Sequence, residues 1–151
     1  AFRESMQLEL IDLTEFNNKV SNIGYFILAN KKLKSILGTL DLSECTNVAS
    51  AFNTNNGALA DIEFVPNTIK ISISFNMCPN LTHDSLMSII NGLATVTETK
   101  TLTLGTTNLA KLTDEEKKQT VEEILPSTDT EFNIPSIYVV YILFNERFNF
   151  S

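Results

Sequence analysis

A repeated pattern of phenylalanine, a small residue and leucine constrains the fold of this chain more than any other feature. The phenylalanines are Phe26, Phe52 and Phe75, which lie 26 and 23 residues apart. The small residues that follow them are Asn30, Asn56 and Cys78, and the leucines are Leu33, Leu59 and Leu81. A period of about 20–29 residues is typical of leucine-rich repeats, in which each unit buries its apolar face only against its neighbours.

Short segments of alternating apolar and polar residues lie between these marks and predict strands. They are residues 40–42 (LDL), 69–75 (IKISISF) and 101–105 (TLTLG). In the second segment the apolar residues that share one face are Ile69, Ile71, Ile73 and Phe75. Because successive side chains of a strand point to opposite faces, this alternation predicts a strand with one buried face.

Two helices are predicted from their start signals. Thr82 can cap a helix over residues 83–96, whose apolar residues at helical spacing are Leu86, Ile89, Ile90 and Leu93. Thr113 and Glu116 have the spacing of a capping box, and Pro126 follows Leu125 as a stop signal. The second helix is therefore expected to begin at Thr113 and to end at Leu125.

The candidate catalytic and metal-binding residues are Cys45, Cys78 and the single histidine, His83. Cys78 and His83 can be imagined as a nucleophile and its base, or all three as zinc ligands. Cys78, however, aligns with Asn30 and Asn56, and at this repeat position a small side chain bonds to the backbone inside a turn. The zinc ligand spacings C-x-x-C and H-x-x-x-H are also missing from the sequence. We therefore expect two buried structural thiols and predict no catalytic residue, no cofactor and no metal.

Charge excludes some partners. The chain has 18 acidic and 11 basic residues and a net charge of −7, which argues against nucleic-acid binding. The run Lys31, Lys32 and Lys34 is interpreted as a solvated turn, and no apolar run reaches the roughly 20 residues of a membrane span. The acidic residues lack calcium-loop spacing and predict only an acidic surface; they are Asp41, Glu44, Asp61, Glu63 and Asp84.

Two polar segments match short motifs only weakly. Residues 53–57 (NTNNG) predict a turn and contain no phosphate-binding pattern. Residues 80–82 (NLT) match a three-residue glycosylation sequon.

Three segments together resemble leucine-rich repeat proteins of the bacterial surface-antigen (BspA-like) class, which also occur in phage-encoded and prophage-encoded proteins. The segments are LDLSECTNVASAF, ISFNMCPNLTHDSLMSIINGLATV and KTLTLGTTNLAKLTDEEK. The resemblance covers about residues 26–118 and is most specific over 75–118. The chain length predicts that residues 1–151 form one domain, and the resemblance implies that this domain has an α/β fold. That domain would be a right-handed solenoid of short parallel strands, with helices or loops returning on the other side.

The C-terminal residues 119–151 depart from this resemblance, since relatives usually end in a short Gly-Trp segment and this chain has no Trp. Residues 137–144 (IYVVYILF) form an apolar block rich in β-formers and predict a strand. Three interpretations stay open: a strand that caps the solenoid, an edge that binds a partner, and an altered tail.

The resemblance implies a non-enzymatic module for protein–protein or cell-surface recognition, and we expect it at a cell surface, secreted or in a phage particle. We interpret the chain as a fragment of a larger surface or phage-associated protein. The alternative is a structural component that assembles with its own copies through residues 137–144. A binding face is expected on the solvent side of the strand row. Its predicted residues are Asp41, Ser72, Ser74 and Thr103.

Overall fold

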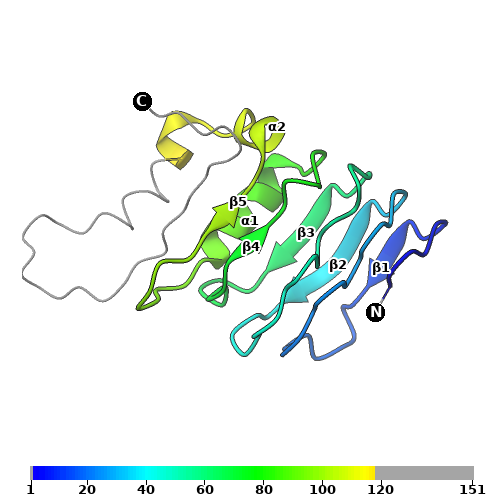
Figure 1. Ribbon diagram of the computed structural model, residues 1–151, viewed down its shortest axis with the longest axis horizontal. Coiled ribbons are helices and arrows are strands. Elements are labelled where there is room, and N and C mark those ends of the chain that lie inside the picture. Colours follow the sequence, from blue (N-terminus) through cyan, green and yellow to red (C-terminus); the bar gives the residue numbers. More distant parts are fainter. Residues whose placement is uncertain (1, 118–151) are drawn as a thin grey trace, which may run out of the picture.

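The computed structural model describes residues 2–117, and successive segments of this part of the chain lie side by side (Figure 1). Strands β1 (Leu10–Asp12), β2 (Ser35–Leu40) and β3 (Asp61–Phe64) form a parallel sheet in the order β1–β2–β3. Strands β4 (Ile73–Ser74) and β5 (Leu102–Thr103) form a second parallel pair. The described chain is therefore mixed α/β, with short parallel strands joined by long connections.

The connections repeat each other along the chain. The backbone N–H groups of residues 23, 25, 27 and 29 donate to the carbonyl oxygens of residues 47, 49, 51 and 53. Each of these bonds joins residues 24 positions apart, and the N–H of Phe2 donates to the carbonyl of Phe26 at the same offset. Each segment therefore satisfies the backbone polar groups of the preceding one, as buried backbone requires.

The three predicted phenylalanines form one continuous row of buried rings. The ring centroids of Phe26 and Phe52 are 6.3 Å apart, and those of Phe52 and Phe75 are 4.8 Å apart. Their predicted equivalence is confirmed by these contacts. Phe2 extends the row with a centroid 5.8 Å from that of Phe26, and Phe64 of β3 packs at 6.1 Å from Phe52. Such aromatic pairs add about 0.5–1.5 kcal/mol each beyond their buried area.

A second buried row is polar, and its members are Asn30, Thr54, Cys78 and Asn108. The Asn30 Oδ1 accepts a hydrogen bond from the N–H of Ser5, and its Nδ2 donates to the carbonyl of Phe2. The Thr54 hydroxyl donates to the carbonyl of Met77 at 2.7 Å and accepts from the N–H of Gly57 at 3.1 Å. These side chains link neighbouring segments from inside the turns.

The prediction that Asn56 belongs to this row is wrong. Asn56 is exposed, and both it and Asn55 have left-handed backbone angles, with φ of 61° and 59°. The turn therefore closes two residues earlier than the pattern predicts, and Thr54 takes the inner position, 24 residues after Asn30.

The two cysteines are both free and buried, as predicted, but only Cys78 joins the polar row. Its thiol donates to the carbonyl of Phe52 at 2.8 Å, and the Asn108 Nδ2 donates to the Cys78 carbonyl at 2.9 Å. The Cys45 thiol instead lies 3.5 Å from the carbonyl of Asn47, two residues further along its own segment. Both thiols are therefore buried, but the two cysteines do not occupy equivalent positions in the repeat.

The strand predictions are accurate for burial and less so for strand limits. In residues 69–75, Ile69, Ile73 and Phe75 are buried and the fourth predicted residue, Ile71, is only half-buried. Ser72 and Ser74 are exposed, yet only Ile73–Ser74 is strand. Residues 40–42 are not a strand of their own, because β2 ends at Leu40. Strand β5 lies within the strand predicted over residues 101–105.

The reason that β2 ends at Leu40 is local. The Asp41 carboxylate accepts a hydrogen bond from the N–H of Ser43 at 2.8 Å, which turns the backbone at this point. Leu40 and Leu42 are both buried on either side of the turn. The alternation of buried and less buried residues thus continues past the end of β2, where the backbone turns and is no longer a strand.

Helix α1 (His83–Gly92) begins where predicted, and the Thr82 hydroxyl accepts from the N–H of Ser85. It ends four residues before the predicted limit of residue 96, because the Gly92 carbonyl accepts from the backbone of Thr68 and Ile69 in the preceding segment. The short helix α2 (Thr106–Leu109) is an addition to the predicted elements.

The predicted capping box is confirmed. The N–H of Thr113 donates to the Glu116 carboxylate at 2.8 Å, and the N–H of Glu116 donates to the Thr113 hydroxyl at 3.1 Å. The predicted helix end at Leu125 and the predicted strand 137–144 lie outside the described residues. Within residues 2–117, no helix has the length and apolar character that a bilayer crossing requires.

The polar row provides a first prediction. Thr54→Val keeps the shape of the side chain but removes a buried hydroxyl that makes two backbone hydrogen bonds, so we expect it to lower the free energy of unfolding by about 1–3 kcal/mol. Urea denaturation followed by circular dichroism measures the change. The matched control is Thr39→Val at an exposed position of β2, which should change stability by less than about 0.5 kcal/mol. Equal effects at both sites would contradict the assigned role of Thr54.

Candidate functional site

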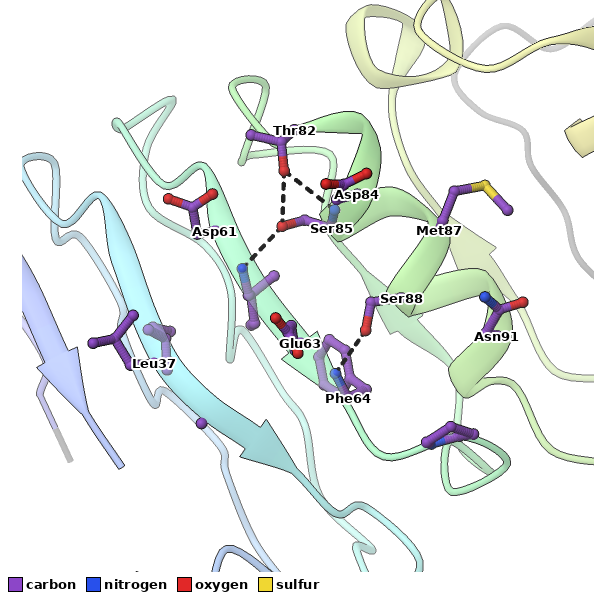
Figure 2. A pocket seen from close by; sticks show the side chains of 14 residues that line it. Leu37, Asp61, Glu63, Phe64, Thr82, Asp84, Ser85, Met87, Ser88 and Asn91 are labelled. Atoms are coloured by element: carbon purple, nitrogen blue, oxygen red, sulfur yellow. Dashed lines mark hydrogen bonds between the residues drawn. The ribbon is translucent and has the colours of Figure 1, made fainter. Parts of the chain in front are cut away.

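Helix α1 lies along the free edge of β3 and completes its hydrogen bonds through side chains. The Ser85 hydroxyl accepts from the N–H of Ile62 at 3.0 Å and donates to the carbonyl of Ala60 at 2.9 Å. One turn further along α1, the Ser88 hydroxyl accepts from the N–H of Phe64 at 2.9 Å (Figure 2). Two helical serines thus replace the backbone partners that another strand would supply. The three-stranded sheet therefore ends at β3, and its edge is not open to further pairing.

The outer face of the sheet and the flank of α1 enclose a groove, which we call the α1 groove. Ile62 and Phe64 of β3 point into the core, so Asp61 and Glu63 point to the outer face. The groove has a volume of about 590 Å³. The described residues that line it are Ile36, Leu37, Gly38, Asp61, Ile62, Glu63, Phe64, Pro66, Thr82, Asp84, Ser85, Met87, Ser88 and Asn91.

The lining combines negative charge with apolar surface. Asp61, Glu63 and Asp84 contribute carboxylates, and the described lining contains no Lys, Arg or His. The Asp61 carboxylate accepts from the Ser35 hydroxyl at 2.8 Å. Leu37 is 40% exposed although it lies in a strand. Figure 2 shows the acidic side chains on β3 and at the start of α1, with Leu37 on the neighbouring strand.

Gly38 shapes the β2 side of the groove. Its φ of +91° is accessible to glycine and strained for other residues, and an added Cβ would lie 3.0 Å from the backbone of Leu13. The pairing of β2 with β3 shifts register between Ser35 and Thr39, around this glycine. Leu37 follows the inward-facing Ile36 and so lies on the outer face beside the groove, just before this bulge.

The structure separates the candidate catalytic residues. The His83 Nε2 lies 2.8 Å from a carboxylate oxygen of Glu116, and its Nδ1 lies 4.0 Å from the Asp84 carboxylate. The Cys78 thiol bonds inside the protein to the Phe52 carbonyl, and burial raises its pKa from 9.0 to about 11. At neutral pH this thiol is protonated and is a poor nucleophile. No group of three or more His, Cys, Asp or Glu residues in the described part of the chain is placed to hold a metal ion.

The four residues of the predicted binding face do not form one row. Ser74 pairs in register with Thr103, and Ser72 lies two residues before Ser74 on the exposed side. Asp41 instead follows β2, and its backbone pairs with that of Lys19 in an isolated parallel β-bridge. It therefore lies at the corner after the three-stranded sheet. The hydrogen bonds from Ser43 hold the pKa of the Asp41 carboxyl below its ordinary value. The prediction of a single face is therefore wrong for Asp41, because the strand row is split into two sheets.

The predicted acidic surface is also divided. Asp61, Glu63 and Asp84 line the α1 groove, whereas the Glu44 carboxylate lies 3.3 Å from the Lys19 ammonium group. Sequence reasoning missed the groove itself. Two sequence features could have indicated it: the acidic residues that alternate with Ile62 and Phe64, and the two serines spaced three residues apart on α1.

The remaining polar candidates have structural partners. Lys32 donates to the Gln7 side chain at 2.7 Å, and the Lys34 ammonium lies 3.5 Å from the Glu9 carboxylate. The Asn80 side chain donates to the carbonyl of Gly57 at 2.8 Å, which ties the sequon residue to the 53–57 turn.

Comparisons with known proteins found no matching protein family, no similar curated protein and no similar solved structure. The resemblance to BspA-like leucine-rich repeats therefore stays a prediction.

The contact between α1 and β3 provides a second prediction. Ser85→Ala removes the acceptor for the buried N–H of Ile62 and should lower the free energy of unfolding by about 1–3 kcal/mol. Amide hydrogen exchange should accelerate selectively at Ile62. The control is Ser21→Ala at an exposed serine, with an expected change below about 0.5 kcal/mol. Unchanged exchange at Ile62 in the Ser85 variant would refute the bond.

A third prediction concerns Cys78. Because its folded-state pKa lies above the unfolded value, its contribution to stability is complete below about pH 9 and is lost as the pH rises towards about 11. In a Cys45→Ala background, a thiol reagent at pH 8 should label Cys78 only as fast as the protein unfolds, and urea midpoints should fall between pH 9 and 11. Rapid labelling of the native protein would contradict the buried, protonated thiol.

Proposed function

We propose that this protein is a non-enzymatic recognition module built as a leucine-rich-repeat-like, right-handed solenoid, and that it binds a protein partner through the α1 groove. The 24-residue offset of the backbone bonds and the parallel pairing of successive strands support the repeat architecture. The right-handed path follows from the general preference of parallel crossover connections.

The single observation that carries the proposal is the open groove on the outer face of the sheet. It combines exposed apolar side chains, such as Leu37, with polar groups at its rim. Apolar surface surrounded by polar residues is typical of sites that bind other molecules. In repeat proteins, binding surfaces commonly follow the row of stacked strands.

The groove favours recognition over catalysis. Its described lining has no histidine or cysteine, and the hydroxyls of Ser85 and Ser88 are already bonded to the backbone of β3. A serine held this way has no neighbouring base to activate it. As the resemblance implies, we place the module at a cell surface or in a phage particle, within a larger protein.

A fourth prediction tests this function with a phage-displayed library of random peptides. Selection on the wild-type protein should yield peptides that bind the groove. These peptides should bind the double variant Leu37→Asn/Met87→Asn at least about tenfold more weakly, because it removes the apolar lining.

The control for this test is the double variant Leu10→Asn/Phe16→Asn. It removes two exposed apolar side chains outside the groove, which are 48% and 66% exposed. Its peptide affinities should equal those of the wild type, and both variants should retain the wild-type melting temperature. Selected peptides that bind all three proteins equally would exclude the groove as the recognition site.

A further inference from the structure

All charged residues that line the α1 groove in the described part of the chain are acidic. Asp61, Glu63 and Asp84 face it, and its described lining offers no cation to neutralise them. A neighbouring hollow of about 440 Å³ contains Lys19 together with Asp41, so charges of both signs are present there. Electrostatic complementarity therefore favours a positively charged partner for the α1 groove and not for its neighbour.

The spacing of the carboxylates matches an extended chain. Asp61 and Glu63 are two residues apart on the same face of β3, which places their positions about 6.5–7 Å apart along the strand. An extended peptide repeats its side chains at the same interval. Basic residues at alternate positions of such a peptide can therefore meet both carboxylates at once.

The apolar part of the groove fits the same side chains. Lys and Arg carry long aliphatic stems that pack on apolar surface while the charged group reaches a polar partner. Leu37 is 40% exposed and Met87 is half-buried, and both line the groove beside the carboxylates. A compact metal ion would leave these apolar side chains uncovered, and the described acidic residues do not form a metal cluster.

We propose that the α1 groove binds an extended peptide segment with Lys or Arg at alternate positions, whose charged groups pair with Asp61 and Glu63 and whose stems cover Leu37 and Met87. The segment belongs to a partner protein. This inference rests on the proposed function, and it adds the chemical class of the partner.

The experiment uses a fluorescein-labelled peptide, Lys-Ser-Arg-Ser-Lys-Ser-Arg, and its counterpart with Gln at every basic position. Fluorescence anisotropy measures the binding of each to the full chain at low and high salt. We expect the basic peptide to bind at micromolar concentrations and to weaken on addition of salt, whereas the Gln peptide should bind at least about tenfold more weakly.

Matched variants separate the groove from the overall charge. Asp61→Asn/Glu63→Gln should weaken the basic peptide about tenfold, as two partly exposed ion pairs are lost. Glu15→Gln/Glu115→Gln changes the net charge equally at exposed positions outside the groove and should leave the affinity within about twofold. Leu37→Ser should weaken binding without changing the salt dependence.

Two results of this peptide experiment would overturn the inference. One is equal loss in the two charge variants, which would indicate attraction to the acidic chain as a whole. The other is equal binding, or no binding, of both peptides to the wild type. If the library yields groove-dependent peptides that lack Lys and Arg, recognition by the groove stands and the basic partner is refuted.

Discussion

The whole described structure depends on one constraint: each segment must satisfy its buried backbone groups with the segment about 24 residues away. The backbone ladder from residues 23–29 to residues 47–53 meets this requirement with main-chain hydrogen bonds. Inside the turns, Asn30, Thr54 and Cys78 meet it with side chains. The row of phenylalanine rings then fills the space between, so apolar packing and hydrogen bonding share the same period. Neither feature would hold a single segment by itself, because each contact needs a neighbour.

Helix α1 interrupts this stacking at the edge of β3. The interior of a helix cannot offer its backbone to a strand, because the N–H and C=O groups there are already paired along the helix axis. Ser85 and Ser88 resolve the conflict, since their hydroxyls point from one face of the helix to the strand edge. The α1 groove lies between the flank of this helix and the outer face of the sheet. The proposed binding site is therefore a consequence of how the sheet ends.

Features that depend on a few neighbouring residues could be predicted from the sequence. The caps at Thr82 and Thr113 are correct because a cap joins residues three positions apart. The burial of Ile69, Ile73 and Phe75 is correct because side chains alternate along an extended backbone whether or not it pairs. Strand limits were less accurate, since pairing depends on a partner segment far away in the sequence. The polar row contains Thr54 and not the predicted Asn56, because Asn55 and Asn56 adopt left-handed backbone angles. The repeat pattern does not reveal these angles.

The sequence by itself determined the period of the chain, its buried rings, its helix starts and its negative charge, because each of these is carried by residue type and spacing. It also contained Asp61, Glu63 and Asp84, but only as scattered acidic residues. Only the tertiary structure decided that these three surround one groove with Leu37 and Met87, while Asp41 and Glu44 lie elsewhere. The physical reason is that a groove is formed by side chains from β2, β3 and α1, and their proximity depends on how the segments stack.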